Sequence, residues 1–266
     1  MTYAASKTIE IEKIPVIDVK PLRAGTLENA HSVALEIRQA AEEIGFFYIR
    51  NHGVPESVIK QSYSAAKDFF NLPKVVKNNV KINSNHHGYL CFGEAKMEQA
   101  ESVDLKESFV WGLDLPDEHP SVTMENPFLG RNQWPVEIPE FKKSVYPFFE
   151  AGLQCGLDMM RAFALGMGLP EDSFLKATDE PIARSSIIHY PPQSEVLGEE
   201  QFGVAPHTDY GCLTLLWQDQ VGGLEVQNRE GEWVTAHPIE NTLVVNVGDL
   251  LMRWTNEGFK STPHRV

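Results

Sequence analysis

From about residue 183 the chain alternates short apolar segments with turn-forming residues, and this pattern limits the folds available to it. The apolar segments cover residues 183–190, 203–208, 213–218, 223–227, 232–236, 242–247 and 259–266. Pro-Pro, Gly-Gly, NREGE, HPIEN and VGD separate them, and all are favourable turn sequences. Many short strands at this spacing predict a β-sandwich or barrel.

The preceding part of the chain has the apolar periodicity of helices. Helices are predicted over residues 28–44, from Pro55 to about Asn71, and over 140–168, whereas 14–19 and 46–51 read as strands. Residues 72–100 are expected to be irregular. The prediction is therefore an α+β fold, in which helices mostly from the N-terminal half flank a β core. We expect residues 1–105 to form a helical and strand region and 106–266 the β-rich region with the long supporting helix, together as one structural unit.

The composition of the chain indicates which binding partners to exclude and in which cellular compartment to expect the protein. The formal net charge of −14 argues against a nucleic acid or an anionic membrane as partner. No apolar run approaches the ~18 residues of a membrane span, and the N-terminus lacks the apolar core of a signal peptide. The three widely spaced cysteines show neither a zinc nor a disulfide pattern, and we interpret them as packing residues. A cytoplasmic protein is expected; the sequence leaves its oligomeric state open.

One strand-like segment begins with metal-binding residue types. In PHTDYGCLTLL, His207 and Asp209 are two residues apart, and on a strand such side chains point to the same face. Two imidazoles and one carboxylate on one side of a divalent iron leave three coordination positions open. His264, in KSTPHRV, is the best candidate for the second histidine because it ends another strand-like segment.

The other histidines fit ordinary roles better. His52, His86, His87, His119 and His237 are in predicted turns or loops, and His189 is expected to be a structural or rim residue facing away from Tyr190. Asp249 is most simply a turn residue after Gly248.

The residues around the His207–Asp209 pair make the signal more specific. The segment from HTDYGCLTLLWQDQ to STPHRV resembles the catalytic barrel of the isopenicillin N synthase-like family, nonheme iron oxygenases and oxidases that mostly depend on 2-oxoglutarate. IPVIDV, EIGFFYIRNHGVPESVI and DLKESFVWGLDLP match the family's N-terminal half. The resemblance covers nearly the whole chain and implies a double-stranded β-helix, or jelly-roll, core.

The resemblance also implies roles for individual residues. His207, Asp209 and His264 would be the iron ligands, and Tyr190 in HYPP would hydrogen-bond the distal carboxylate of 2-oxoglutarate. The family often has an asparagine two residues before this tyrosine, where this chain has Ile188.

The family also places an Arg-x-Ser about ten residues after the second histidine, and its arginine pairs with the same cosubstrate carboxylate. The sequence ends at Val266, and the expectation is that a closing strand follows, because an open barrel would expose an unpaired edge. Arg265 should point away from the site occupied by His264, whereas Arg184 has the parity of Tyr190 and is a candidate for cosubstrate binding.

The function implied is oxidation of a small organic substrate by O2, with Fe(II) and 2-oxoglutarate, release of succinate and CO2, and ascorbate as a candidate reductant. No catalytic side chain beyond the metal ligands is expected. The alternatives are an oxidase of the isopenicillin N synthase type that does not use 2-oxoglutarate, a non-catalytic metal-binding relative, and a zinc hydrolase. The substrate and the outcome, whether hydroxylation, desaturation or ring closure, stay open.

Overall fold

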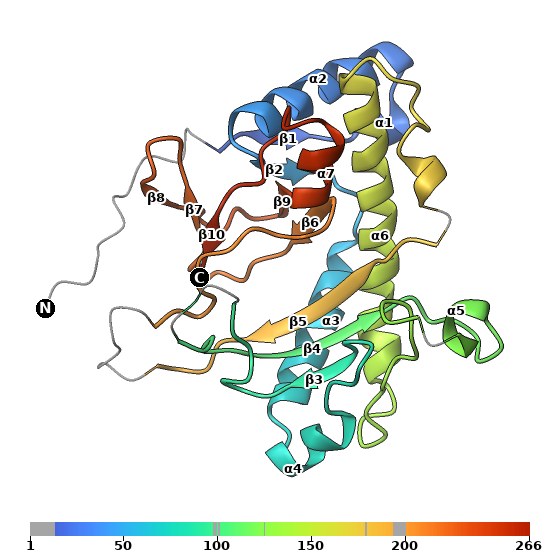
Figure 1. Ribbon diagram of the computed structural model, residues 1–266, viewed down its shortest axis with the longest axis vertical. Coiled ribbons are helices and arrows are strands. Elements are labelled where there is room, and N and C mark those ends of the chain that lie inside the picture. The colour runs from blue at the N-terminus through green and yellow to red at the C-terminus, as the bar shows by residue number, and fades with distance from the viewer. Residues whose placement is uncertain (1–13, 98–99, 101, 125, 179, 194–200) are drawn as a thin grey trace, which may run out of the picture. The chain divides into compact units, whose positions relative to one another are not determined.

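The computed structural model describes residues 14–97, 100, 102–124, 126–178, 180–193 and 201–266, and these form two compact units (Figure 1). Of these described residues, unit 1 combines those in 14–54, 154–178 and 206–266, and unit 2 those within 55–153 and 180–205. Each unit therefore joins segments that are far apart in the sequence. The boundary predicted at residue 105 lies inside unit 2, and the division that it describes stays a prediction.

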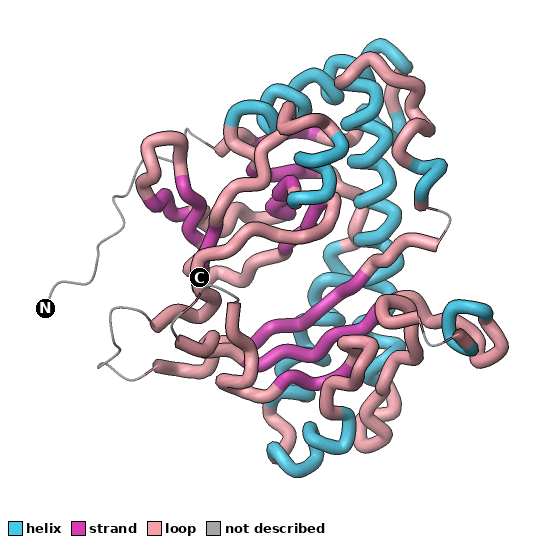
Figure 2. Tube along the Cα trace, in the orientation of Figure 1, coloured by secondary structure: helices cyan, strands magenta, loops and turns pink. Residues whose placement is uncertain are grey.

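Unit 1 contains two sheets (Figure 2). The four-stranded sheet has the order β1 (Val16–Asp18), β2 (Phe46–Arg50), β9 (Thr242–Val247), β6 (Leu213–Leu216). The three-stranded sheet has the order β10 (His264–Arg265), β7 (Glu225–Gln227), β8 (Trp233–Thr235). All neighbouring strands are antiparallel except β1 and β2. Every residue of the central strand β9 is buried, which explains its continuous apolar run around Asn246.

The helices of unit 1 follow from local sequence signals. They are α1 (Pro21–Ala24), α2 (Leu27–Glu43), the part of α6 (Phe141–Gly166) from Gln154 onward, the 3₁₀ turn η3 (Leu175–Ala177) and α7 (Asp249–Trp254). The Thr26 side chain caps α2 by accepting a hydrogen bond from the Asn29 N–H. After α2, Gly45 has a φ of +76°, and a Cβ there would lie 2.1 Å from the Lys260 carbonyl oxygen. The turn into β2 therefore requires glycine.

Unit 2 is built on the antiparallel sheet β3 (Gly88–Leu90), β4 (Glu107–Gly112), β5 (Arg184–His189). Its helices are α3 (Glu56–Phe70), α4 (Lys74–Lys77), α5 (Pro120–Thr123), the first half of α6 and the 3₁₀ turn η2 (Asn78–Val80). An aromatic core that includes Phe69, Phe109, Trp111 and Phe141 joins the sheet to α3 and α6. Burying each such side chain contributes about 1.5–3 kcal/mol. The β5 side chains alternate between half-buried and exposed along the strand.

Most predicted elements are found within a few residues of their expected bounds, but one predicted strand is wrong. Residues 203–208 form no strand; His207 makes only an isolated β-bridge with His264. Pro206 has no N–H for a ladder at this point. The strand predicted over 259–266 is reduced to β10, the turn predicted at VGD leads into helix α7, and α4, η2 and β3 lie within the segment expected to be irregular.

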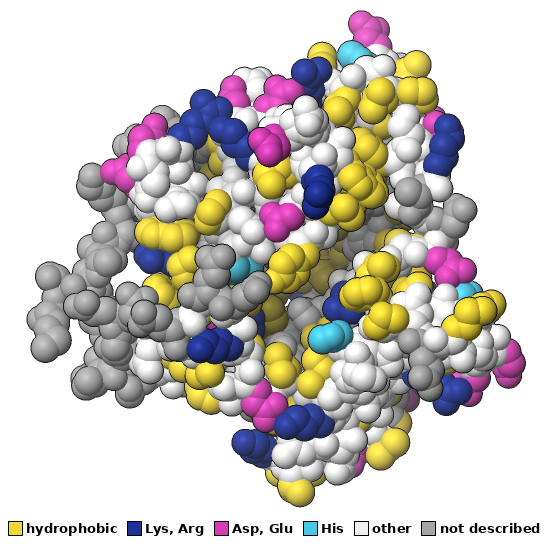
Figure 3. Space-filling view, in the orientation of Figure 1, with side chains coloured by type: hydrophobic (Ala, Val, Ile, Leu, Met, Phe, Trp, Pro, Cys, Tyr) yellow, Lys and Arg dark blue, Asp and Glu magenta, His cyan; other side chains and the backbone are white. Residues whose placement is uncertain are grey.

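The described surface gives two further observations. In the view of Figure 3, acidic and basic side chains are scattered among uncharged ones. Within the described residues, no helix is both long and apolar enough to span a bilayer.

Candidate metal centre

Three side chains from unit 1 come together as the sequence predicts. The metal-binding atoms of His207, Asp209 and His264 all lie within 4.8 Å of one another, and this is the one such group among the described residues. The Asp209 Oδ1 atom is 3.6 Å from His207 Nε2 and 3.7 Å from His264 Nε2. The two imidazole rings are 4.3 Å apart between centroids. An ion between these three atoms would have two nitrogen ligands and one oxygen ligand.

The two histidines are held by direct backbone pairing. The His207 N–H donates to the His264 carbonyl at 3.0 Å, and the His264 N–H donates back at 2.9 Å. His264 is also paired with Val226 of β7, and the edge of Phe46 contacts its ring. The His264 Nδ1 atom lies 3.1 Å from the Thr262 carbonyl oxygen, which can only accept. Nδ1 therefore carries the proton, and the Nε2 lone pair is left for a metal.

Asp209 reaches the histidines from a loop and not from a strand. The start of α7 braces that loop: the Asp249 N–H donates to the Asp209 carbonyl at 2.7 Å, and the Gly248 N–H donates to the Cys212 carbonyl at 2.9 Å. The Thr208 hydroxyl donates to Asp249 Oδ2 at 3.2 Å. The sequence analysis predicted the convergence of His207 and Asp209, but the supporting element is the helix terminus that it missed.

One oxygen of the Asp209 carboxylate accepts hydrogen bonds from neighbouring side chains, and the other faces the two imidazoles. Its Oδ2 atom accepts hydrogen bonds from Asn246 Nδ2 at 2.9 Å and from the Thr214 hydroxyl. Burial raises the pKa of Asp209, but these two hydrogen bonds and the neighbouring imidazoles outweigh burial and hold its pKa below the ordinary value. Oδ1 is thus oriented as a single, ionised ligand atom.

The donor set fits ferrous iron. Burial lowers the pKa of His264, which favours the neutral imidazole that a metal requires. Two neutral imidazoles and a carboxylate, with other positions open, are the ligand types of nonheme Fe(II) oxygenases. We infer that this chain can hold Fe(II) through His207, Asp209 and His264.

The predicted cosubstrate residues are on β5 and directly after it, in unit 2. Arg184 and Tyr190 are an even number of residues apart, so that alternation along the strand places their side chains on the same face, and both side chains are exposed. Within the described part of the chain, neither the Tyr190 hydroxyl nor the Arg184 guanidinium has a hydrogen-bond or ion-pair partner; Arg184 only lies over the Phe128 ring. Six residues of strand separate their Cα atoms by about 20 Å. This spacing makes them poor candidates for holding the same carboxylate.

The remaining candidates have structural partners. Arg265 donates to Glu225 Oε2 at 2.6 Å and lies 4.3 Å from the centre of the Trp233 ring, so it is anchored to β7 and β8. His189 is bound to Glu107 and packs against Phe70, which agrees with a structural role. The five loop histidines are outside the metal-binding group. Sequence reasoning missed Asn246 and Thr214, which no local motif links to Asp209.

Replacing Asn246 with alanine should weaken iron binding without removing a ligand. Asp209 would lose the donor that fixes Oδ2, and loss of such supporting hydrogen bonds typically costs 10–100-fold in metal affinity. The dissociation constant for Fe(II), measured anaerobically, checks this expectation. Val245→Ala is the matched control, because it removes a buried neighbouring side chain of β9 and should lower stability alone. An unchanged iron affinity in Asn246→Ala would contradict the assignment.

Comparisons with known proteins agree with this geometry. Residues 14–137 match the family described as "non-haem dioxygenase in morphine synthesis N-terminal", and residues 182–266 match the "2OG-Fe(II) oxygenase superfamily". The chain is 36% identical to the 2-oxoglutarate-Fe(II) type oxidoreductase ppzC of Metarhizium rileyi, covering 96% of this chain and 73% of that protein. It is 35% identical to the 2-oxoglutarate-dependent dioxygenase citB of Monascus ruber, covering 95% and 79%.

Solved structures show the same fold. A full-length Neurospora crassa protein crystallised in complex with alpha-KG superposes with a TM-score of 0.85 at 32% identity, covering 98% of this chain and 82% of that one. A putative 2OG-Fe(II) oxygenase family protein from Caulobacter crescentus has a TM-score of 0.81 at 30% identity, covering 95% and 79%. The α+β fold with a jelly-roll core is thereby confirmed. Sequence, structure and metal-binding group together place this chain in the 2-oxoglutarate–Fe(II) oxygenase superfamily, as a nonheme iron, 2-oxoglutarate-dependent oxidoreductase.

Proposed function

We propose that the protein uses O2 to oxidise a small organic substrate while 2-oxoglutarate is converted to succinate and CO2. In the hydroxylation form of this reaction, one oxygen atom enters the substrate C–H bond and the other enters succinate, so that atoms and electrons balance. Ascorbate would serve to keep the iron ferrous. The relatives' 2-oxoglutarate-dependent activities favour this proposal over an oxidase that takes all its electrons from the substrate.

The single observation that carries the proposal is the geometry of the His207, Asp209 and His264 group. His207, Asp209 and His264 would hold the iron, which would supply the redox chemistry with O2 and 2-oxoglutarate. The protein's own part is to present two imidazoles and one carboxylate oxygen, of which the His264 ring is already oriented by Thr262 and the Asp209 carboxylate by Asn246 and Thr214. No further side chain of this group is needed as a strong base.

For the cosubstrate we propose Tyr190 as a hydrogen-bond donor to the distal carboxylate of 2-oxoglutarate. Support comes from its exposed position and from a hydroxyl without a partner in the described chain. Although Tyr190 is 38% exposed, desolvation of its hydroxyl by the surrounding protein and the charge of Asp104 raise the pKa of Tyr190 above its ordinary value, so the phenol stays protonated and able to donate. Arg184 is the weaker candidate for that carboxylate because of its distance along β5.

Two compounds lead the substrate search. The full-length Neurospora crassa protein has also been crystallised with thymine and with 5-formyluracil, at 31% and 32% identity to this chain. Small pyrimidines are therefore the first substrates to assay, followed by a panel of other small organic molecules. Product analysis by mass spectrometry separates hydroxylation from desaturation and ring closure.

The deciding experiment is an anaerobic titration of the purified protein with Fe(II) and then with 2-oxoglutarate. A saturable visible charge-transfer band that His264→Ala removes is the expected result. O2 uptake coupled to succinate formation then follows turnover. Iron binding without a band, together with O2 uptake that does not depend on 2-oxoglutarate, would instead favour the oxidase.

Replacing Tyr190 with phenylalanine should weaken 2-oxoglutarate binding by roughly 10- to 150-fold and spare iron. The change removes one hydrogen bond to a charged group, which contributes about 1.5–3 kcal/mol. Calorimetric titration of the Fe(II)-loaded, anaerobic protein measures the effect, and a separate Fe(II) titration is the internal control. If 2-oxoglutarate affinity did not change, Tyr190 would have no role in binding it.

A further inference from the structure

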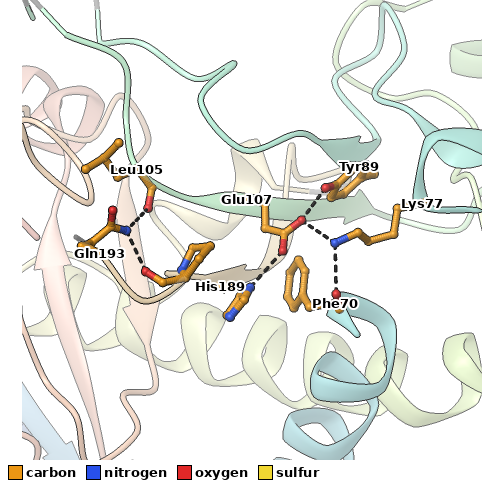
Figure 4. Close-up of polar contacts among 8 residues, drawn as sticks. Phe70, Lys77, Tyr89, Leu105, Glu107, His189 and Gln193 are labelled. Carbon is orange, nitrogen blue, oxygen red and sulfur yellow. Dashed lines mark hydrogen bonds and ion pairs between the residues drawn. The ribbon is translucent and has the colours of Figure 1, made fainter. Parts of the chain in front are cut away.

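A mostly buried polar network adjoins the aromatic core of unit 2, to which its Tyr89 belongs. Figure 4 shows the contacts of this network. Its centre is the Glu107 carboxylate on β4. Glu107 Oε2 accepts hydrogen bonds from Lys77 Nζ at 2.7 Å and from the Tyr89 hydroxyl, and Oε1 accepts from His189 Nδ1 at 2.9 Å. Lys77 also donates to the Phe70 carbonyl at 3.0 Å. Four segments of the unit thus meet at one carboxylate.

Burying the charges of this network costs free energy that apolar side chains in the same place would not, so its contribution to stability does not by itself explain it. The Lys77 and Glu107 side chains are only 8% and 7% exposed. Burial raises the pKa of Glu107, but the hydrogen bonds from Lys77, Tyr89 and His189 outweigh burial and lower it, so the carboxylate is ionised. A buried ion pair can commonly be replaced by apolar side chains without loss of stability, and its best-supported benefit is to select one arrangement.

The arrangement selected here is the pairing of β4 with β5. Glu107 and His189 are directly opposite each other in the register, and their side chains bond across it. A slip of one residue would move every β5 side chain to the other face of the sheet. The bond therefore fixes on which face of the strand end Tyr190 lies.

A second anchor holds the other side of Tyr190. Gln193 Nε2 donates to the Leu105 carbonyl at 3.4 Å and to the Pro191 carbonyl at 2.7 Å (Figure 4). Glu107 is the first residue of β4, and Leu105 lies two residues before it, so both anchors are at the same end of that strand. The chain is thus tied to the same end of β4 just before and just after Tyr190, while its own hydroxyl has no partner in the described residues.

We propose that His189, held by Glu107, and Gln193, held by the Leu105 carbonyl, are positioning residues that fix Tyr190 for the cosubstrate. The inference rests on the role proposed above for Tyr190. It predicts that changes at His189 or Gln193 alter 2-oxoglutarate binding, although neither side chain contacts that ligand.

The test compares variants in the full-length, Fe(II)-loaded protein under anaerobic conditions. His189→Phe keeps a ring against Phe70 but removes the Nδ1 donor, whereas His189→Asn retains a donor near the Nδ1 position. We expect His189→Phe to raise the dissociation constant for 2-oxoglutarate about tenfold and His189→Asn to restore it to within about threefold of the parent, in the range typical of outer hydrogen-bond partners. Gln193→Leu, at an exposed position, should raise it several-fold.

Two controls separate positioning from general damage. The Fe(II) dissociation constant should stay unchanged, because all three proposed ligands belong to unit 1, and the melting temperature should not fall in proportion to the binding loss. Parallel losses of iron affinity and 2-oxoglutarate affinity would overturn the inference.

The outcome can also be told apart from a failure of the proposed function. If Tyr190→Phe weakens 2-oxoglutarate binding but His189→Phe and Gln193→Leu do not, the positioning role is wrong and the role of Tyr190 stands. If Tyr190→Phe itself has no effect, both are wrong. Should His189→Phe fail to fold, Gln193→Leu decides.

Discussion

Asp209→Ala should abolish iron retention and reduce 2-oxoglutarate-dependent O2 uptake at least 100-fold. The substitution removes the one carboxylate in the metal-binding group, and two imidazoles alone form a much weaker site. Iron content after gel filtration and the rate of succinate formation measure the two effects. Adding Fe(II) should raise the melting temperature of the parent protein, since a ligand at 100 times its dissociation constant stabilises by about 2.7 kcal/mol, but it should not raise that of the variant.

Asp249→Ala is the matched control for Asp209→Ala. It removes a carboxylate with the same change in net charge, and this carboxylate belongs to a residue that is hydrogen-bonded to the Asp209 loop but is not part of the group. This variant should retain iron, with a modest loss of stability from the missing acceptor for Thr208. Full iron occupancy and full activity in Asp209→Ala would show that Asp209 is not a metal ligand and would overturn the assignment of the His207, Asp209 and His264 group.

The three proposed ligands could be picked out from the sequence, two of them by a local chemical pattern and the third through the family resemblance. His207 and Asp209 are two residues apart, and His264 stands in a short motif within the resemblance, so residue type and order were sufficient. The helices could also be predicted from the sequence. In α2, the spacing of apolar residues indicates the face that is buried, which includes Val33, Ile37 and Ala41.

The support of Asp209 could not be predicted in the same way. The sequence analysis placed His207 and Asp209 on one face of a strand by alternation alone, but in the structure the N-terminus of α7 braces the loop that carries Asp209. Asp249 after Gly248 is compatible with a turn and with the first turn of a helix, and only the tertiary contacts of the 209–212 loop decide between them.

The Glu107 network illustrates a second limit. Its tyrosine, lysine and histidine partners lie 18, 30 and 82 residues from Glu107 along the chain, and no sequence periodicity links residues at those separations. The sequence allowed a structural role to be assigned to His189, but its partner became identifiable only with the β4–β5 register. Long-range polar pairing depends on which strands are neighbours, and local propensity does not encode that.

Gly248→Ala should weaken iron binding roughly 5- to 150-fold, although Gly248 is not one of the proposed ligands. A Cβ atom at this position would lie 2.2 Å from the Gly211 carbonyl oxygen and 2.9 Å from that of Asp209. The φ of Gly248 is −102°, which any residue adopts, so the effect would be steric and would not come from backbone strain. Because both clashing atoms are backbone, α7 or the loop carrying Asp209 has to move, at a cost of about 1–3 kcal/mol.

The neighbouring glycine provides the control for this prediction. A Cβ atom on Gly211 would meet nothing within 4 Å. Gly211→Ala therefore adds one methyl group, as Gly248→Ala does, on the other residue of the Gly248–Gly211 contact and without a clash. We expect Gly211→Ala to keep the iron affinity and melting temperature of the parent, and Gly248→Ala to lose both. Equal iron affinities for the two variants would show that the carboxylate of Asp209 is held by Asn246 and Thr214 alone, and that the start of α7 does not position it.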